Sequence, residues 1–331
     1  MKITYSFSSS IASIIIRYLD LKQSLGRKYI IESRIFQHLD KFLNTTDSDL
    51  TAESFAKWCY TQQNNASGVR RNWMRTVHNL CLYRQRTEPL CFIPDPLQFP
   101  LLHQPIQPHI FTEDEIIRLF EAIKQLKPGT RSPIRRENFR LALVLLYTTG
   151  LRRRELIKLT LGDYNSTERT LLIRESKFHK SRIIPLSQDG YNELEAYLKI
   201  RRNRHLPISK ESPLLWNKHH KTRIGYYTGA GLWTTFQSLF RIANIHTSNG
   251  RYPRLHDFRH AFAVHALLRW YREGENVQAK LPVLSIYMGH VSVVSTQYYL
   301  RFIQEVVNSA SKRFEKRYSR LVSKSYKRGV R

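Results

Sequence analysis

A proline-rich stretch divides the chain and limits what each part can fold into. Residues 89–109 hold six of the 13 prolines and a single formal charge, Asp95. Proline fixes φ and removes a backbone donor, so this stretch is predicted to be extended and stiff. A chain of 331 residues is long enough for two hydrophobic cores. The predicted organisation is an N-terminal domain at 1–88, a linker at 89–110, a second domain at 111–307 and a basic tail at 308–331.

The N-terminal part is predicted to be a small helical bundle. Apolar residues recur at helical spacing through residues 8–86 and indicate four short helices, the last from Ser67 to Arg86. Ser10 is expected to cap the first helix, and Gly26 to end it. Thr51 is expected to cap the third helix.

The second part is predicted to be mostly helical with one β-hairpin. Thr112 and Glu115 have the spacing of a capping box at the start of a helix. Residues 170–174 and 182–186 are β-prone runs on either side of a polar turn. The predicted fold class is therefore mainly α with a small antiparallel β-sheet.

The charge balance indicates a polyanionic partner. The chain has 54 Lys and Arg against 26 Asp and Glu, a formal net charge of +28. Such self-repulsion costs stability, and nucleic acid is its usual counterpart. A membrane surface normally requires a basic amphipathic helix or a lipid anchor.

Secreted cationic toxins tend to carry disulfides. Here Cys59, Cys81 and Cys91 form no CxxC pair, which favours free thiols in a reducing cytoplasm. The apolar run at residues 14–16 is broken by Arg17 and is too short for a signal sequence.

Several catalytic motifs are missing from the sequence. It contains no G-x-x-x-x-G-K-[ST] loop, no H-E-x-x-H and no G-x-S-x-G. The scarcity of acids argues against a two-metal nuclease. His256 and His260 stand at i and i+4, as zinc ligands on a helix can, but no third ligand follows at a recognisable spacing. We expect neither a metal nor a cofactor.

Basic and protic residues form an ordered series instead. The series is T-G-L-R-R-R-E-L at 149–156, S-K-F-H-K-S-R-I-I-P-L at 176–186, L-H-D-F-R-H at 255–260, and M-G-H at 288–290 with a tyrosine nine residues beyond the histidine. Over residues 111–303 this order resembles the tyrosine recombinase (phage integrase) family, whose core-binding domain resembles the N-terminal part in kind. The resemblance implies six catalytic residues: Arg152, Lys177, His256, Arg259, His290 and Tyr299.

The resemblance also implies the chemistry. Such an enzyme cleaves and rejoins DNA through a covalent 3′-phosphotyrosine intermediate, without metal or ATP, because that bond stores the energy of the broken phosphodiester. Tyr299 would be the nucleophile and His256 its general base. Arg152 and Arg259 would bind the non-bridging oxygens, with His290 as a third donor. The lysine at 177 would protonate the leaving 5′-oxygen.

Three details depart from the family pattern or need a choice. Ser176 and Phe178 flank Lys177 where the family often has glycine, so Lys180 is an alternative general acid. Tyr298 is expected to pack inward, because only its neighbour fits the nine-residue offset. Glu155 is expected to be a partner for an arginine rather than a catalytic acid.

The expected partner is double-stranded DNA, bound by a homotetramer in the synapse and by a monomer when free, in the cytoplasm and nucleoid of a bacterial-type cell. The arginines of the fourth helix are either a solvated face or a DNA contact surface. The expected DNA contacts are Arg70, Arg71, Arg75, Arg153, Arg154 and Lys180. Two alternatives remain at this stage: a type IB topoisomerase-like enzyme that relaxes DNA, and a non-catalytic DNA-binding protein.

Overall fold

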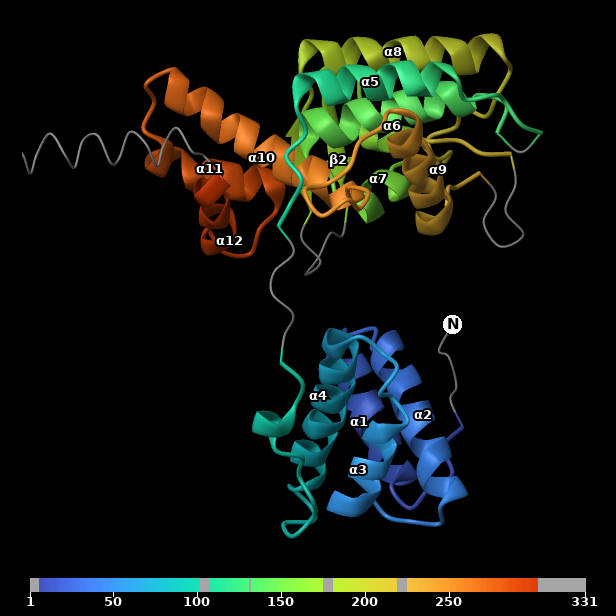
Figure 1. Ribbon diagram of the computed structural model, residues 1–331. Helices are drawn as coiled ribbons and strands as arrows, with labels where there is room; N and C mark the ends of the chain where they lie inside the picture. Colours follow the sequence, from blue (N-terminus) through green and yellow to red (C-terminus); the bar gives the residue numbers. More distant parts are fainter. Residues whose placement is uncertain (1–5, 102–106, 131, 175–180, 219–224, 303–331) are drawn as a thin grey trace, which may run out of the picture. The chain divides into compact units, whose positions relative to one another are not determined.

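The computed structural model shows two compact units, Met1–Gln107 and Pro108–Arg331, drawn in Figure 1. It describes the chain except for residues 1–5, 102–106, 131, 175–180, 219–224 and 303–331. The predicted tail at 308–331 and both candidate lysines, Lys177 and Lys180, therefore lie outside the described residues.

The N-terminal unit is a bundle of four helices (Figure 1). They are α1 (Ala12–Ser24), α2 (Ile30–Thr45), α3 (Ala52–Tyr60) and α4 (Ser67–Arg84). Each helix contributes at least one completely buried residue to the shared core, among them Ile15, Phe36, Trp58 and Val77. The predicted four-helix bundle is confirmed.

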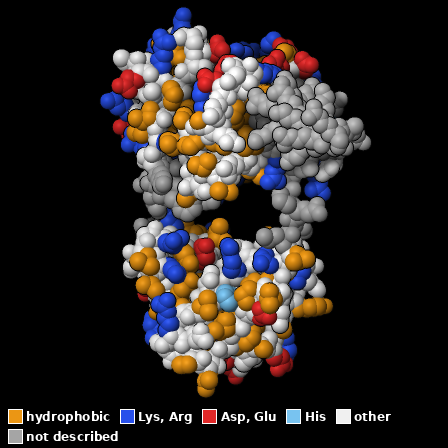
Figure 2. Space-filling model, turned by 90° about the vertical axis from the view of Figure 1, so that its left-hand side faces the viewer, with side chains coloured by type: hydrophobic (Ala, Val, Ile, Leu, Met, Phe, Trp, Pro, Cys, Tyr) orange, Lys and Arg blue, Asp and Glu red, His pale blue; other side chains and the backbone are white. Residues whose placement is uncertain are grey.

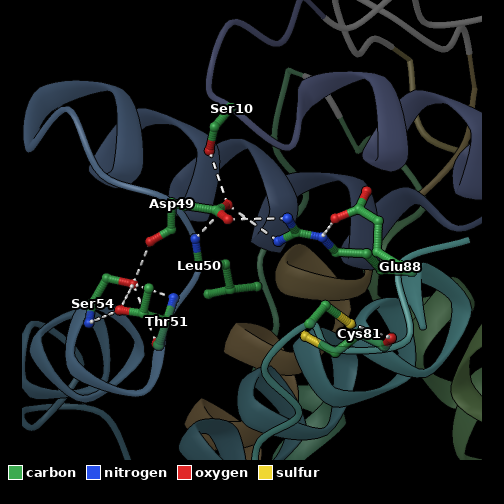
Figure 3. Close-up of polar contacts among 9 residues, drawn as sticks. Ser10, Asp49, Leu50, Thr51, Ser54, Cys81 and Glu88 are labelled. Atoms are coloured by element: carbon green, nitrogen blue, oxygen red, sulfur yellow. Dashed lines mark hydrogen bonds and ion pairs between the residues drawn. The ribbon is translucent and has the colours of Figure 1, made fainter.

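The helix ends agree with the sequence in two of three cases. Gly26 has φ +76°, as expected for a glycine after the end of a helix. Thr51 caps α3 in a reciprocal capping box with Ser54. The prediction for Ser10 is wrong, because α1 begins later and Ile11 occupies its N-cap position. The Ser10 hydroxyl instead donates to Asp49 Oδ1 at 3.1 Å (Figure 3).

Asp49 is the centre of a polar junction near the end of α4 (Figure 3). Arg84 donates to both of its carboxylate oxygens, at 3.1 and 3.0 Å, and to Glu88 at 2.7 Å. The Arg84 side chain is only 12% exposed. This arginine therefore stabilises the bundle, joining α4 to the loop between α2 and α3.

The first part of the proline-rich stretch, residues 91–99, packs on the same unit. Phe99 is buried in the bundle's core cluster, and Phe92 and Ile93 pack against it. A short 3₁₀ turn, η1 (Pro96–Gln98), lies between them. The composition of this stretch predicts an extended segment, but its aromatic residues Phe92 and Phe99 also bury apolar surface against the helices.

The C-terminal unit is built around α6, which is buried on most sides. The helices are α5 (Glu113–Lys124), α6 (Arg135–Thr149), α7 (Arg153–Lys158), α8 (Gln188–Asn203), α9 (Gly229–Ile242), α10 (Leu255–Arg272), α11 (Val277–Met288) and α12 (Val294–Gln297), with 3₁₀ turns η2 (Leu161–Asp163) and η4 (Tyr298–Phe302). Helices α5 and α8 lie along α6, and α10 also packs on it (Figure 1). The predicted capping box of Thr112 and Glu115 opens α5.

A small sheet completes this unit. Its strands are β1 (Tyr164–Asn165), β2 (Thr170–Ile173) and β3 (Arg182–Pro185), antiparallel in the order β1-β2-β3. The register pairs Leu171 with Ile184 and Ile173 with Arg182. The predicted hairpin and the mainly α fold class are confirmed. Strand β1 was not predicted, because two residues are too few to give a periodic pattern.

Two apolar clusters hold the unit together. The larger lies around α6 and includes Phe111, whose ring stacks on that of Phe258 in α10 with 4.2 Å between the ring centroids. The smaller joins α10, α11 and η4, and Tyr299 belongs to it. In the described part of the chain, no helix is both long and apolar enough to cross a membrane.

Candidate active site

A glycine turn places the first motif arginine. Gly150 ends α6 with φ +61°, and a Cβ at this position would lie 2.6 Å from Phe262 Cδ1. Only glycine fits both the backbone angle and this close approach to α10. The chain then extends through Arg152, which is the N-cap residue of α7. The T-G-L-R motif is therefore a tight turn between two buried elements.

Glu155 binds two arginines from different elements. The Arg152 backbone N–H and Nη1 donate to its two oxygens at 2.9 and 2.7 Å. Arg182 of β3 donates through Nη1 and Nη2 at 3.0 and 2.8 Å. Burial raises the pKa of Glu155, but the bonds and charge of Arg182 and the bonds from Arg152 outweigh it and lower the pKa to about 2. The expectation that Glu155 serves an arginine is confirmed.

Arg259 is almost completely buried on α10, with 1% of its surface exposed. Its Nη1 donates to the carbonyl of Gly150 at 2.7 Å, and its Nη2 donates to the carbonyl of Met288. Carbonyl oxygens carry no full negative charge, so they orient the guanidinium without neutralising it. Burial, followed by the charge of Arg152, lowers the pKa of Arg259. An anion at this position would be strongly stabilised.

Two histidines stand beside these arginines. His256, in the first turn of α10, is exposed on one side. Burial of the rest of the ring and the charge of Arg259 lower its pKa. His290 follows Gly289, and its Nδ1 lies 2.8 Å from the hydroxyl of buried Thr296. Burial and Arg259 lower the pKa of His290 as well, so both rings are neutral at pH 7.

Tyr299 completes the group. It lies in η4, is 3% exposed, and its ring is 5.4 Å from that of His260 and 6.2 Å from that of His290. Burial raises the pKa of its phenol, and the charge of Arg259 opposes this effect. Tyr298 packs on the apolar cluster of α10, α11 and η4, as expected, but its side chain is only half-buried and lies under the guanidinium of Arg301 at 4.2 Å. The short turn buries the second tyrosine of the pair more deeply than the first.

A cavity of about 410 Å³ opens beside these residues. It is lined by Arg152, Arg153, Arg154, Trp233, Arg254, Leu255 and His256. Four guanidinium groups in one cavity make it suited to an anion such as a phosphate. Arg153 and Arg154, both expected DNA contacts, are exposed here, and Arg153 packs on the first turn of α9 beside Gly229. Among the described residues, no cluster of three or more His, Cys, Asp or Glu side chains could hold a metal ion.

Lys180 lies outside the described residues, and the three remaining expected DNA contacts lie in the N-terminal unit, on α4. Arg71 donates to the carbonyl of Pro100 at 2.9 Å, so part of its donor capacity holds the proline-rich stretch. Arg75 is exposed, whereas Arg70 is half-buried, and no hydrogen bond is formed by its Nε. Several Lys and Arg side chains lie on the visible face of this unit, in the lower half of Figure 2.

Three residues of the site were not singled out from the sequence. Arg182 stands in the motif at residues 176–186, but spacing along the chain does not show which carboxylate it pairs with. Arg254 precedes the H-D-F-R-H motif and caps α10 through Asp257. Trp233 lies on α9, outside every motif. A basic residue at a helix N-cap interacts unfavourably with the helix dipole. This unusual position was the one feature of the sequence that could have pointed to Arg254.

A buried tyrosine beside fixed arginines and neutral histidines, on a mainly helical fold, defines the class of tyrosine recombinases. The family model described as the phage integrase family matches residues 109–305, more than half of the chain. The chain therefore belongs to the phage integrase family. It is a tyrosine recombinase, an enzyme of site-specific recombination, and the topoisomerase and non-catalytic alternatives are not favoured.

Individual relatives agree. The chain is 30% identical over 304 residues to the putative integrase/recombinase y4rB of Sinorhizobium fredii, covering 91% of this chain and 96% of that protein. It is 29% identical over 206 residues to tyrosine recombinase XerA of Pyrococcus furiosus, covering 62% of each. A lambda integrase dimer bound to a core site has a similar fold, with a TM-score of 0.60 at 17% identity, over 88% of this chain and 77% of that one.

Proposed function

We propose that this recombinase cleaves a DNA strand by attack of Tyr299 on a phosphodiester, forming a 3′-phosphotyrosine bond, and rejoins strands by the reverse step without metal or ATP. One observation carries the proposal: the phenol is buried beside Arg259, and Arg259 and Arg152 are fixed by main-chain carbonyls next to a cationic cavity. Preorganised donors of this kind stabilise a charged transition state most effectively.

The nucleophile has to lose a proton as it attacks. Burial raises the pKa of Tyr299, so the phenol is neutral until a base accepts its proton. The lowered pKa of His256 leaves its ring unprotonated at neutral pH, as a general base must be. The positive charge of Arg259 favours the phenolate that forms.

The attacked phosphate gains negative charge in the transition state. Arg152 and Arg259 supply planar guanidinium donors for its non-bridging oxygens. His290 supplies a third donor through the ring nitrogen that does not face Thr296. These side chains are held from behind by carbonyl and hydroxyl oxygens, so little reorganisation is needed when the phosphate arrives.

The leaving 5′-oxygen needs a proton, which we assign to Lys177, with Lys180 as the alternative. A DNA substrate with a bridging 5′-sulfur separates the two, because sulfur leaves without a proton. Cleavage of this substrate should be nearly normal for the alanine variant of the true general acid. A variant that is equally slow on both substrates has lost something other than the proton donor.

Double-stranded DNA is the proposed substrate. Four copies of the protein would bind it in the synapse, and the protein would be a monomer when free. Two similar folds were solved as DNA complexes, the lambda integrase dimer on a core site and the Tn1549 transposon integrase on a transposon end. The net charge of +28 supports the same partner. We place the protein with DNA in the bacterial cytoplasm and nucleoid.

Covalent trapping tests the proposal. The protein is incubated with nicked site DNA in EDTA, denatured, and resolved for a protein–DNA adduct at the 3′-phosphate. We expect adduct from the wild type and from Tyr298→Phe, which serves as the matched control, and none from Tyr299→Phe. An adduct from Tyr299→Phe would refute the assigned nucleophile, and a need for Mg²⁺ would refute the mechanism.

A further inference from the structure

The C-terminal end of α11 carries three consecutive carbonyl groups that each accept a hydrogen bond from a different arginine. The bonds are Arg182 Nε to Tyr287 O at 2.8 Å, Arg259 Nη2 to Met288 O at 2.5 Å and Arg152 Nη2 to Gly289 O at 2.8 Å. The last carbonyls of a helix lack partners within it, and they lie at the negative end of its dipole. This helix end is therefore a natural binding place for guanidinium groups.

Two of these arginines are the proposed phosphate ligands, and Arg182 is the third. Its side chain is only 9% exposed, and its three nitrogens are all bonded inside the protein: Nε to Tyr287, Nη1 and Nη2 to Glu155. Its donors are therefore committed to the protein, and Arg182 is poorly suited to contact the substrate directly.

The partner of Arg182 is the carboxylate that also orients Arg152. Glu155 bonds to the backbone N–H and to Nη1 of Arg152, while Nη2 of Arg152 reaches the carbonyl of Gly289. Gly289 has φ +65°, and a Cβ there would lie 3.0 Å from Arg182 Nη1. Arg182, Glu155, Arg152 and the end of α11 thus form a closed ring of contacts.

We propose that Arg182 is a positioning residue for strand cleavage: it fixes the Glu155 carboxylate and ties β3 to the end of α11, so that Arg152 is aimed at the scissile phosphate. This inference rests on the proposed function. A misplacement of a catalytic group by about 1 Å can cost about 10²-fold in rate. The loss of Arg182 should therefore slow cleavage without weakening DNA binding to a similar extent.

The test measures single-turnover adduct formation at saturating protein, with DNA affinity measured separately. Arg182→Gln should reduce the rate constant about 10²-fold and leave affinity within about threefold. Arg182→Lys keeps the charge but cannot form the forked contact, so it should recover only part of the rate. Arg174→Gln is the matched control, because Arg174 directly follows β2, the other strand of the hairpin, and pairs with Asp163.

Two further readouts separate positioning from a loss of structure. If Arg182 acts through Glu155, the double variant Arg182→Gln/Glu155→Gln should be about as slow as the slower single variant. Without Arg182, burial would raise the pKa of Glu155, and the remaining bonds from Arg152 and the charge of Arg259 would oppose this effect less strongly. The rate of Arg182→Gln should then fall more steeply than that of the wild type as pH decreases from 7 to 5.

The inference is overturned if the cleavage rate constant of Arg182→Gln is within about threefold of the wild type. It is also overturned if the reduction in rate is independent of pH and additive with the effect of Glu155→Gln. If circular dichroism shows that Arg182→Gln is unfolded, Arg182→Lys decides by the same criteria. Failure of the proposed function looks different, since Tyr299→Phe would then still form the adduct whatever residue stands at position 182.

Discussion

Replacing Glu155 with glutamine should change how the stability of the C-terminal unit depends on pH. The pKa of this carboxyl is lowered from an ordinary 4.5 to about 2 by Arg182 and Arg152. This difference corresponds to about 3 kcal/mol of folding free energy. Because the folded pKa is lowered, the contribution is fully present above pH 4.5 and is lost as pH falls toward 2. Glu155 is 7% exposed, so solvent screens little of this interaction.

Hydrogen exchange of peptides from α6 and α10 measures the opening free energy of this unit separately from the N-terminal bundle. At pH 7, Glu155→Gln should be less stable than the wild type by about 3 kcal/mol, because Arg152 and Arg182, with side chains only 22% and 9% exposed, lose their carboxylate. The gap should narrow between pH 5 and pH 3, because the carboxyl of the unfolded chain, with its ordinary pKa of 4.5, takes up a proton there while the folded carboxyl stays ionised. Glu168→Gln, at an exposed position in the same unit, is the control. A gap that is equal at pH 7 and pH 3 would refute the ion-pair argument.

Three further outcomes follow from the same contacts. Phe111→Ala should lower the free energy of unfolding of the C-terminal unit by about 3–5 kcal/mol, measured by urea denaturation, because its ring is completely buried. Gly150→Ala should lower both stability and cleavage rate, because the new Cβ would lie 2.6 Å from the Phe262 ring and the backbone angle φ is +61°. An unchanged melting temperature would contradict this prediction. The lowered pKa of His256 predicts that cleavage persists below pH 6.5, the ordinary pKa of histidine, in single-turnover assays over pH 5–8. Loss of activity centred at about pH 6.5 would show that the His256 pKa is not lowered.

Local signals in the sequence were sufficient for much of the fold. Helical spacing predicted the bundle, and capping chemistry placed the starts of α3 and α5 at Thr51 and Thr112. The hairpin followed from two β-prone runs around a polar turn. These features depend on interactions between residues close together in the chain, so short stretches of sequence are enough to predict them. The prediction for Ser10 failed because a cap is defined by where the helix begins, and α1 begins at Ala12 with Ile11 as its N-cap residue.

The nucleophile illustrates the boundary between the two kinds of information. Sequence order and the resemblance to the family selected Tyr299 over its neighbour, because offsets along a motif are a property of the chain. Which tyrosine is buried, and what surrounds it, depends on how η4 packs on α10 and α11. Only the tertiary structure placed the phenol beside Arg259 and so accounts for the opposing effects on its pKa.

By itself, the sequence determined the helical fold class, the hairpin and the basic character, and it predicted the six catalytic residues. The tertiary structure alone decided that the end of α11 receives three arginines, separated from it by as many as 137 positions in the case of Arg152 and Gly289. The physical reason is that unpaired helix carbonyls and a buried carboxylate select partners by distance in space, which no spacing along the chain encodes.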